Sequence, residues 1–443
     1  MSRNFELRCP NCRVVVRLGI PACPKCGGNL EVVYRNLEFT ECEGRGVWRF
    51  SSVLPTPSSP VSLGEGSTPL IAAKRLGDRV GLENLYLKDE SRNPTGSFTD
   101  RGAAVVVSWA LELGLNSVSC RTSGDVAASL AAYCARAGIV CCASPSYMMD
   151  RYRLYQFMLY GGRLGSPKKG AYVVRHSDPL LVEGYKTISY EIALSLGEAD
   201  AVIVPTGSGA LLYALWKGFR EAAATGMIAR EPRMIAVQES TCAPVVRAFE
   251  RSLGEPLRIG DAGSCLAVEI CDPSPARGRE ALMALRESGG SAVAVEPSDV
   301  LAWIGLLAEL EGVIAEPAAA AGIASLPVLV KKGVLERSSR VVAIVTGAGL
   351  KDPRSLLASL RRSRRIGPTK LMILRVLRER GSIHAYAVWR ELRRRGLNLT
   401  KPAVYQNLWI MERGGLVRSR IMGRRRVYEL TEEGWRVCET AES

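Results

Sequence analysis

Two pairs of cysteines near the start of the chain have the spacing of a metal site. Each pair forms a C-x-x-C knuckle, and ten residues separate the two knuckles. Four thiolates with this spacing can close a tetrahedral zinc site, which leaves no open position for substrate. Gly27 and Gly28 allow the tight turn that aims backbone N–H groups at the sulfurs. The sequence therefore predicts structural zinc in a ribbon over residues 1–35; a lost metal and a redox pair are the alternatives. The four ligands would be Cys9, Cys12, Cys23 and Cys26.

A glycine-rich turn is the second feature suited to chemistry. The β-prone run Val202–Val204 leads into Gly207-Ser208-Gly209-Ala210, and a helical pattern follows from Leu211 to Glu221. Backbone N–H groups at a helix N-terminus bind anions, and glycines let the backbone approach a phosphate closely. The turn predicts a phosphate site, and its alternative is a structural corner between strand and helix.

The elements that would position this turn form an α/β fold. Continuous apolar runs end near Gly, Pro or a polar residue and are separated by helical patterns, which indicates a mostly parallel sheet covered on both faces. The runs are Val202–Val204, Met234–Val237, Ala292–Val295 and Val341–Val345.

Composition limits the class of protein. The chain has 443 residues, 47% hydrophobic, and no apolar stretch of the roughly 18 residues that a membrane helix needs. Residues 1–10 have no apolar core of a signal peptide, so we expect a soluble, cytoplasmic protein. In that compartment the nine cysteines outside the knuckles are expected to be small buried hydrophobes. With two histidines, His176 and His384, histidine-based catalysis is not expected.

The segment 93–102 resembles the cofactor-lysine segment of threonine synthases, which are tryptophan-synthase-β-like, fold type II pyridoxal phosphate enzymes. The family pattern is Asn-Pro-Thr-Gly-Ser-Phe-Lys-Asp-Arg-Gly. The chain reads Asn-Pro-Thr-Gly-Ser-Phe-Thr-Asp-Arg-Gly, so Thr99 stands in the lysine position. Further motifs resemble the family in the same order over residues 62–353: 122–125, 183–187, 205–211, 316–320 and 346–353. The resemblance implies the two-lobed fold type II scaffold, and a cysteine ribbon also occurs in one branch of the family.

The resemblance also implies site residues. Asp125 matches the Asn that faces the phenolic oxygen of the cofactor in much of the family, and Thr346 matches the Thr that bonds the pyridine nitrogen. Ala210 replaces a Gly of the phosphate loop. The cofactor-binding set would be Phe98, Thr99, Asp125, Gly207, Ser208, Gly209, Ala210, Leu211 and Thr346. The ligand loop would be Ser97, Thr122, Ser123 and Gly124.

Thr99 removes the chemistry of the family lysine. A threonine hydroxyl cannot form an imine and supplies no amine base near neutral pH. Lys88 and Lys186 match motif lysines that do not form the imine, so neither is a natural replacement; catalysis would require another lysine or an external amine. A carboxylate at Asp125 would repel the phenolate oxygen unless it is protonated. Pyridoxal phosphate, if it binds, would be held without a covalent link.

The excess positive charge lies at the end of the chain. Residues 361–443 hold 20 Lys and Arg against 8 Glu, hence +12 of the total +15. Charge segregated in this way is typical of nucleic-acid binding. The same segment has helical periodicity over Thr369–Arg380, so a solvated basic tail is the weaker interpretation.

The pattern over 368–434 predicts a winged helix-turn-helix. Ser382 is expected to cap the second helix, and Thr400 to cap the third, which ends at Gly414-Gly415. Leu416–Met422 and Arg425–Leu430 would form the wing. The segment resembles PadR-like repressors at His384-Ala385-Tyr386, Val404-Tyr405, Gly415-Leu416-Val417, 424–428 and 430–434.

The third helix would enter the major groove of double-stranded DNA and the wing would meet phosphate or the minor groove. Simple solvation of these side chains, or a winged helix used for protein contacts, is the alternative. Candidate contacts are Thr400, Lys401, Ala403, Tyr405, Gln406, Asn407, Arg424, Arg425 and Arg426.

Three functions are compatible with these features. The first is a homodimeric transcription regulator in which a non-catalytic threonine synthase-like domain senses pyridoxal phosphate, threonine or a phosphorylated precursor. The second is a threonine synthase or related lyase acting on O-phosphohomoserine, with an appended DNA-binding domain. The third is an architectural DNA-binding protein with a degenerate core. The expected organisation is a ribbon over 1–35, a connecting stretch over 36–61, the core over 62–353, a basic linker over 354–367 and the winged helix over 368–443.

Overall fold

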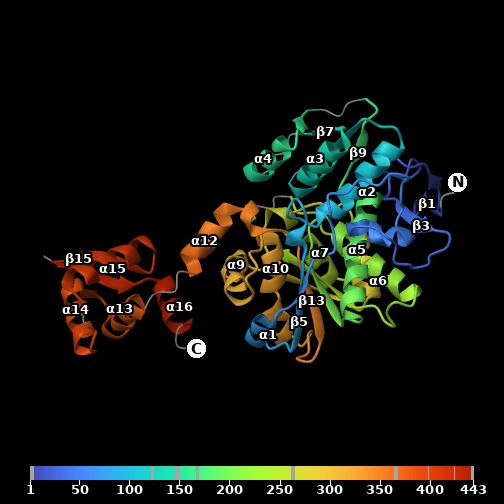
Figure 1. The fold of residues 1–443 in the computed structure, drawn as a ribbon. Coiled ribbons are helices and arrows are strands. Elements are labelled where there is room, and N and C mark those ends of the chain that lie inside the picture. The colour runs from blue at the N-terminus through green and yellow to red at the C-terminus, as the bar shows by residue number, and fades with distance from the viewer. Residues whose placement is uncertain are drawn as a thin grey trace. The chain divides into compact units, whose positions relative to one another are not determined.

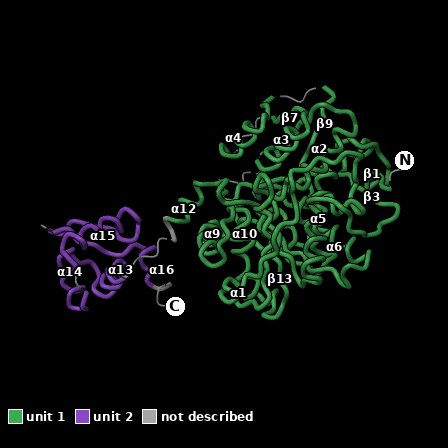
Figure 2. Tube along the Cα trace, in the orientation of Figure 1, with its two compact units in different colours: residues 1–360 green, residues 361–443 purple. Residues whose placement is uncertain are grey.

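The structure, a computed structural model, describes residues 4–120, 124–144, 150–165, 169–260, 265–363, 368–397, 399–423 and 425–440. The chain divides into two compact units, residues 1–360 and 361–443 (Figure 2). In the described residues no helix is long and apolar enough to cross a membrane.

The first unit begins with a small antiparallel sheet in the order β2-β1-β3. Its strands are β1 (Phe5–Arg8), β2 (Val15–Val16) and β3 (Glu31–Tyr34). The knuckle sulfurs lie together: Cys9 to Cys26 is 3.6 Å and Cys12 to Cys23 is 3.3 Å. Gly27 has a φ of 72°, and the N–H of Gly28 points at the Cys26 sulfur at 3.4 Å, as the glycine pair predicts. This cluster could hold a metal ion.

The large sheet has six strands in the order β12-β11-β10-β13-β5-β4, of which all but the edge strand β4 run parallel. Alternate residues of β10 enter different cores: Val202 and Val204 pack into one, Ala201 and Ile203 into the other. Both faces are therefore buried, which explains the continuous apolar runs and confirms the four predicted strands. The strands are β4 (Leu70–Ala72), β5 (Asn84–Asp89), β10 (Ala201–Pro205), β11 (Arg233–Glu239), β12 (Ser291–Val295) and β13 (Arg340–Val345).

A second, parallel sheet of four strands forms a smaller lobe in the order β8-β7-β6-β9. It lies with α3 and α4 at the edge of the first unit (Figure 1). The strands are β6 (Ser117–Cys120), β7 (Val140–Ala143), β8 (Arg163–Leu164) and β9 (Tyr172–Val174). The two sheets give the two-lobed α/β scaffold that the resemblance implies.

The helices of the first unit cover both sheets, with α5 packed against α6 and α10 against β10 and β13. They are α1 (Lys74–Val80), α2 (Thr99–Glu112), α3 (Asp125–Ala137), α4 (Arg151–Leu159), α5 (Pro179–Leu196), α6 (Ala210–Ala224), α7 (Pro244–Glu250), α8 (Gly278–Glu287), α9 (Pro297–Glu311), α10 (Pro317–Ala324) and α11 (Leu326–Lys331). Helix α12 (Pro353–Ser363) begins in the first unit and extends past its last residue, 360. Short 3₁₀ turns are η1 (Gly46–Val53), η2 (Glu90–Arg92), η3 (Val268–Ile270) and η4 (Gly349–Lys351).

The second unit has the predicted winged-helix order. Its antiparallel sheet runs β14-β16-β15, and its core gathers Leu374, Val388, Val404 and Leu408. Its elements are α13 (Pro368–Arg380), β14 (Ile383–His384), α14 (Ala385–Arg394), α15 (Lys401–Arg413), β15 (Val417–Met422), β16 (Arg425–Leu430) and α16 (Glu432–Thr440).

The expected cap at Ser382 is wrong. His384 caps α14 instead, because its Nδ1 accepts from the N–H of Ala387 at 3.0 Å. Ile383 and His384 pair with β16, so the chain is still extended there and the helix begins later than expected. The Ser382 hydroxyl donates to Glu429. Thr400 does cap α15, as predicted.

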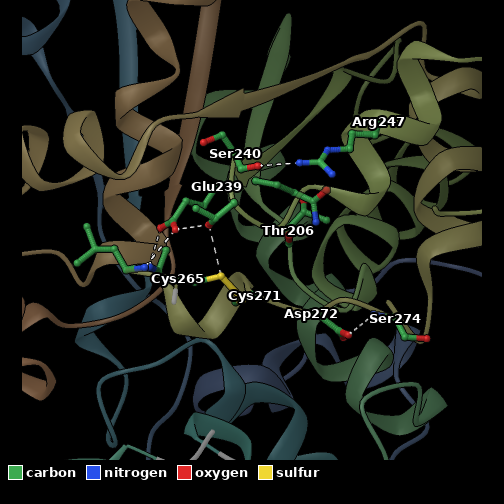
Figure 3. The surroundings of a disulfide bond; sticks show 12 residues. Thr206, Glu239, Ser240, Arg247, Cys265, Cys271, Asp272 and Ser274 are labelled. Carbon is green, nitrogen blue, oxygen red and sulfur yellow. Dashed lines mark hydrogen bonds between the residues drawn. A yellow bond between two sulfur atoms is a disulfide. The ribbon is translucent and has the colours of Figure 1, made fainter. Parts of the chain in front are cut away.

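The expectation for the scattered cysteines is wrong at one pair. Cys265 and Cys271 form a disulfide, with their Cα atoms 6.2 Å apart (Figure 3). Six of the others are buried thiols that form no disulfide, as expected, whereas Cys42 is partly exposed, against the expectation. A spacing of six residues carries no disulfide signal by itself; the turn of η3 between the two residues brings their side chains together.

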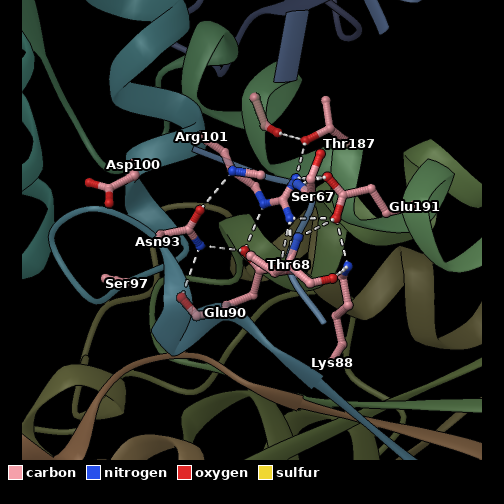
Figure 4. Close-up of polar contacts among 12 residues, drawn as sticks. Ser67, Thr68, Lys88, Glu90, Asn93, Ser97, Asp100, Arg101, Thr187 and Glu191 are labelled. Atoms are coloured by element: carbon pink, nitrogen blue, oxygen red, sulfur yellow. Dashed lines mark hydrogen bonds and ion pairs between the residues drawn. The ribbon is translucent and has the colours of Figure 1, made fainter. Parts of the chain in front are cut away.

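A buried ion network fixes the start of α2. The guanidinium of Arg101 donates to Glu90 at 2.6 Å and to Glu191 at 2.8 Å, and Lys88 donates to Glu191 at 2.6 Å (Figure 4). Thr68 and Thr187 complete the shell, at 3.1 and 3.0 Å from Arg101. The network joins β5, η2, α2 and α5 in a region with almost no solvent contact.

We expect Arg101→Met to lower the free energy of unfolding by about 3–5 kcal/mol, because it leaves the buried carboxylates of Glu90 and Glu191 without their shared cation. Urea unfolding followed by circular dichroism measures this. Arg92→Met is the matched control: Arg92 pairs with Asp89 but its side chain is 62% exposed, so its loss should cost less than about 1 kcal/mol. Equal losses in both variants would contradict this role of Arg101.

Candidate functional site

A cavity of about 280 Å³ lies where the carboxyl ends of β10 and β13 meet the starts of α2, α3 and α6. Ligands of open α/β sheets bind at such strand ends. The wall of the cavity includes Thr206 after β10, Thr346 after β13 and the segment 268–273. The volume suits a small metabolite.

The glycine turn forms one end of the cavity. Gly209 has a φ of 84° and precedes Ala210, the first residue of the 15-residue helix α6. A Cβ on Gly207 would lie 2.9 Å from the carbonyl oxygen of Glu269, and one on Gly209 would lie 2.6 Å from that of Arg277. Within the described residues, the N–H groups of Gly207, Ser208 and Gly209 donate to no protein acceptor. Close packing and unpaired amides at a helix start make this end suitable for a phosphate.

Thr99 is the first residue of α2, is 3% exposed and lines the cavity. Its hydroxyl lies 2.8 Å from that of Ser129, which in turn lies 3.0 Å from that of Thr95. Of the described residues that line the cavity, none is a lysine. Lys88 is held in the Arg101 network, and Lys186 lies 2.6 Å from both Glu183 and Glu221. Neither lysine reaches the cavity wall.

The other end of the cavity is a cluster of three carboxylates and two cations. Arg153 lies 2.7 Å from Asp125, 3.0 Å from Glu269 and 2.8 Å from Glu316. Lys351 lies 2.6 Å from Asp125 and 3.6 Å from Glu316. The sequence reasoning missed Arg153, Glu269 and the role of Lys351. Lys351 and Glu316 belong to the quoted family motifs and so carried a signal, whereas Arg153 lies outside them.

These contacts set the charges. Burial disfavours the ionised form of Asp125, but Lys351 and Arg153 outweigh it and hold the pKa of this carboxyl below its ordinary value. Asp125 is therefore ionised, and two cations rather than a proton balance it. Burial, only partly offset by Arg153, raises the pKa of Glu269 to about 7. Burial also acts on Lys351, yet Asp125 and Glu316 raise its pKa, which keeps this amine protonated and a poor nucleophile.

The remaining predicted residues of the core fall into three groups. Phe98 and Leu211 line the cavity with the glycine turn, and Thr346 lines it while donating to Glu316 at 3.2 Å. Ser97 is buried in a bridge to Gly347, and the Glu269 carboxylate covers Gly124, 2.7 Å from where a Cβ would lie. Thr122 and Ser123 lie outside the described residues.

The cavity fits one half of pyridoxal phosphate. The unpaired amides of the glycine turn suit its phosphate. Thr99 and the protonated, ion-paired Lys351 do not suit its aldehyde, because an imine needs an unprotonated amine. The residues present therefore fit a phosphate-bearing molecule held without a covalent bond, and they do not fit a covalently linked cofactor.

The second unit presents a basic groove of about 940 Å³ beside α15 and the wing. Arg390, Arg425 and Arg426 line it together with Tyr386 and Tyr405. Of the candidate contacts on α15, Gln406 is exposed, whereas Asn407 donates to the Ala403 carbonyl at 2.8 Å and Thr400 accepts from Ala403 as the cap.

Two basic side chains at this groove have partners within the unit. The ammonium of Lys401 lies 4.9 Å from the ring centres of Tyr386 and Trp389. Arg426 contacts Glu412 at 3.2 Å. Arg424 lies outside the described residues. Arg425 is exposed and lies 3.2 Å from the Nε2 of His384, a contact that uses one nitrogen of its guanidinium. Exposed Gln406 and Arg425, which has no carboxylate partner among the described residues, are the better candidates for a base and a phosphate contact.

Comparison with known proteins agrees with this architecture. Residues 61–347 match the family described as pyridoxal-phosphate dependent enzyme, and residues 373–440 match the PadR-like family of transcriptional regulators. The threonine synthase of Methanosarcina acetivorans is 35% identical over 380 residues, covering 80% of this chain and 94% of that protein. The threonine synthase of Methanocaldococcus jannaschii is 36% identical over 384 residues, covering 80% and 95%.

Solved structures share the fold at low identity. Maize serine racemase superposes with a TM-score of 0.56 at 19% identity, over 67% of this chain and 92% of its own. Tomato (Solanum lycopersicum) threonine deaminase isoform 2 gives 0.54 at 20% identity, over 67% and 88%. The chain therefore belongs to the pyridoxal-phosphate-dependent enzyme family, has threonine synthases as relatives, and carries a PadR-like regulator domain at its C-terminal end.

Proposed function

We propose that the chain is a DNA-binding transcription regulator whose threonine synthase-like domain binds a phosphorylated, amino-acid-related metabolite without turning it over. The observation that carries the proposal is the pairing of Thr99, buried where the family lysine belongs, with a glycine turn whose amides remain suited to phosphate. Candidate ligands are non-covalent pyridoxal phosphate, threonine and a phosphorylated precursor; the phosphate-bearing ones suit the turn best.

Regulation requires that the ligand bind two conformations with different affinity. In this proposal the ligand joins the glycine turn of the large sheet to the Asp125 end of the small lobe, because the cavity walls come from both. A homodimer would present two recognition helices, each α15, to a two-fold related operator in double-stranded DNA.

The ribbon is proposed to carry structural zinc on its four thiolates. Its edge is tied to the core: Lys217 donates to the Val32 carbonyl at 2.7 Å and Arg277 to the Leu30 carbonyl at 2.8 Å. A closed four-thiolate site would stabilise this docking and take no part in chemistry.

Thr99→Lys tests whether catalysis was lost at this one position. With added pyridoxal phosphate and O-phosphohomoserine, we expect no phosphate release by the wild type. The Thr99→Lys protein should release phosphate at least about 100-fold faster than the background rate measured with the wild type, because the lysine supplies both the covalent link and the base. Thr99→Met is the matched control, since it has similar length and no amine.

Turnover by the wild type would reject the regulator proposal in favour of an enzyme using another amine, with Lys351 the first to test. If neither protein turns over and pyridoxal phosphate and O-phosphohomoserine both leave the melting temperature unchanged, the cavity binds no such ligand and the architectural function stands instead.

Glu269 should make ligand binding depend on pH. Its pKa of about 7 means that it is largely protonated at pH 6 and ionised at pH 8. Above pH 7 its negative charge adds to that of Asp125, against the charges of Arg153 and Lys351, and opposes an anionic ligand. We expect Glu269→Gln to bind pyridoxal phosphate as well as the wild type at pH 6 and up to roughly tenfold more tightly at pH 8 by calorimetry. If the ratio of the variant's affinity to the wild type's is the same at pH 6 and pH 8, Glu269 does not cause the pH dependence.

Gln406 and Arg425 should affect DNA binding differently. On a duplex selected by the full chain from a randomised pool, Gln406→Ala should cost about 1–3 kcal/mol and leave non-specific binding unchanged. Arg425→Ala should weaken binding to every duplex and reduce its salt dependence. Arg380→Ala, at the end of α13 and outside the groove, is the control. If neither variant weakens DNA binding, or if Arg380→Ala weakens it as much as they do, this orientation of the winged helix is wrong.

A further inference from the structure

The segment 265–273 connects the two ends of the cavity. Its middle is η3, and Val268 to Pro273 line the cavity wall. The Glu269 carbonyl and the Ile270 Cα would lie 2.9 and 3.0 Å from a Cβ on Gly207, so this backbone rests on the glycine turn. The Glu269 carboxylate reaches Arg153 at 3.0 Å at the other end. The position of this segment therefore sets the shape of both ends.

The disulfide closes this segment into a ring. Cys265 and Cys271 are its two ends, and Glu269 lies within it. Glu239 holds the first half separately, because its carboxylate accepts from the N–H groups of Leu266 at 3.1 Å and Ala267 at 2.8 Å (Figure 3). The S–S bond is a covalent link from that anchor to the second half, which carries Cys271 and the cavity-lining Asp272 and Pro273. Two backbone hydrogen bonds of 3.1 Å, from Ile270 to Ala267 and from Cys271 to Val268, join the halves as well.

A third sulfur lies beside the bond. The Sγ atoms of Cys242, Cys265 and Cys271 all lie within 4.8 Å of one another, and Cys242 is a buried free thiol. Burial raises the pKa of the Cys242 thiol, with Asp272 and Glu239 adding to the effect, which favours the protonated thiol over the thiolate that would attack a disulfide. Cys265 is partly exposed, which gives an external reagent access to the bond.

We propose that Cys265 and Cys271 form a reversible thiol–disulfide site that controls the wall of the ligand cavity. In the oxidising direction the two thiols give up two protons and two electrons to hydrogen peroxide, whose O–O bond breaks to give two waters while the S–S bond forms. In the reducing direction a small dithiol forms a mixed disulfide at one sulfur, releases the other as a thiol, and then closes its own disulfide. The effect on ligand affinity rests on the proposed function; the redox site and the wall do not.

The first experiment needs no ligand. Full-length protein is treated with hydrogen peroxide or with dithiothreitol, its free thiols are alkylated, and peptides are identified by mass spectrometry. We expect Cys265 and Cys271 to be linked after peroxide and both alkylated after dithiothreitol. Hydrogen–deuterium exchange should then be at least about tenfold faster in 265–273 and around Gly207 in the reduced protein. Unchanged exchange, or failure of the two residues to link, would overturn the proposal.

The second experiment adds pyridoxal phosphate as probe. Its dissociation constant should differ at least threefold between oxidised and reduced wild type, and not at all between the two treatments of Cys265→Ser/Cys271→Ser. Cys42→Ser, a partly exposed thiol outside the cluster, should behave as wild type. Equal affinity in both states, with binding present, would overturn control of the cavity by this site. If pyridoxal phosphate binds in neither state, the proposed ligand has failed, and the exchange data decide the redox site separately. Should the double variant fail to fold, the single variant Cys265→Ser, which cannot form the bond to Cys271, replaces it as the control.

Discussion

The guanidinium of Arg101 lies fully buried between the carboxylates of Glu90 and Glu191. Two such carboxylates would be prohibitive to bury without a shared cation, so the segments that carry them can approach only where Arg101 is present. This constraint fixes the start of α2 against η2 and α5. A Cβ on Gly184 would lie 2.2 Å from the Arg101 carbonyl oxygen, which shows how closely α5 approaches there. Thr99, two residues before Arg101, is placed at the cavity wall as a consequence.

The Arg101 network does not involve the side chain at position 99, so its contacts do not depend on which residue stands there. The hydroxyl of Thr99 pairs with Ser129, so the buried position is satisfied without an amine. The parts of the site that bind an anion, the amides of the glycine turn, belong to the backbone and are also independent of position 99. The amides suited to bind an anion and the position that would supply covalent chemistry are therefore separate parts of this site.

The charged end of the cavity depends on side chains rather than on the backbone. Asp125, Glu269 and Glu316 outnumber Arg153 and Lys351, and burial makes every ionised carboxylate costly. The three carboxylates differ in charge as a result. Asp125 has the shortest contacts to Arg153 and Lys351 and stays ionised, whereas the pKa of Glu269 is raised to about 7. Glu269 lies in the ring closed by Cys265 and Cys271 and also lines the cavity. In the proposal, a change at the disulfide would therefore move a residue that contributes to the charge of the cavity.

Sequence alone determined the architecture, since each signal was local. Runs such as Val341–Val345, the C-x-x-C knuckles, the Gly207–Ala210 turn and the helix start at Thr400 each depend on neighbouring residues, and the structure has a strand, a sulfur cluster, a strand-to-helix turn and a capped helix there. The motif order also identified Thr99 as the substitution that matters. Its consequences for function stay predictions.

Tertiary structure decided what depends on residues far apart in the chain. Arg153 reaches Asp125 and Glu316 only because α4, α3 and the start of α10 converge, and no spacing rule connects these positions. His384 displaced Ser382 as a cap because strand pairing with β16 delays the helix. The Cys265–Cys271 bond arises from the turn of η3 against Glu239. Local free energies are encoded by neighbouring residues, whereas charge balance, pairing across a sheet and sulfur contacts exist only once distant segments have packed together.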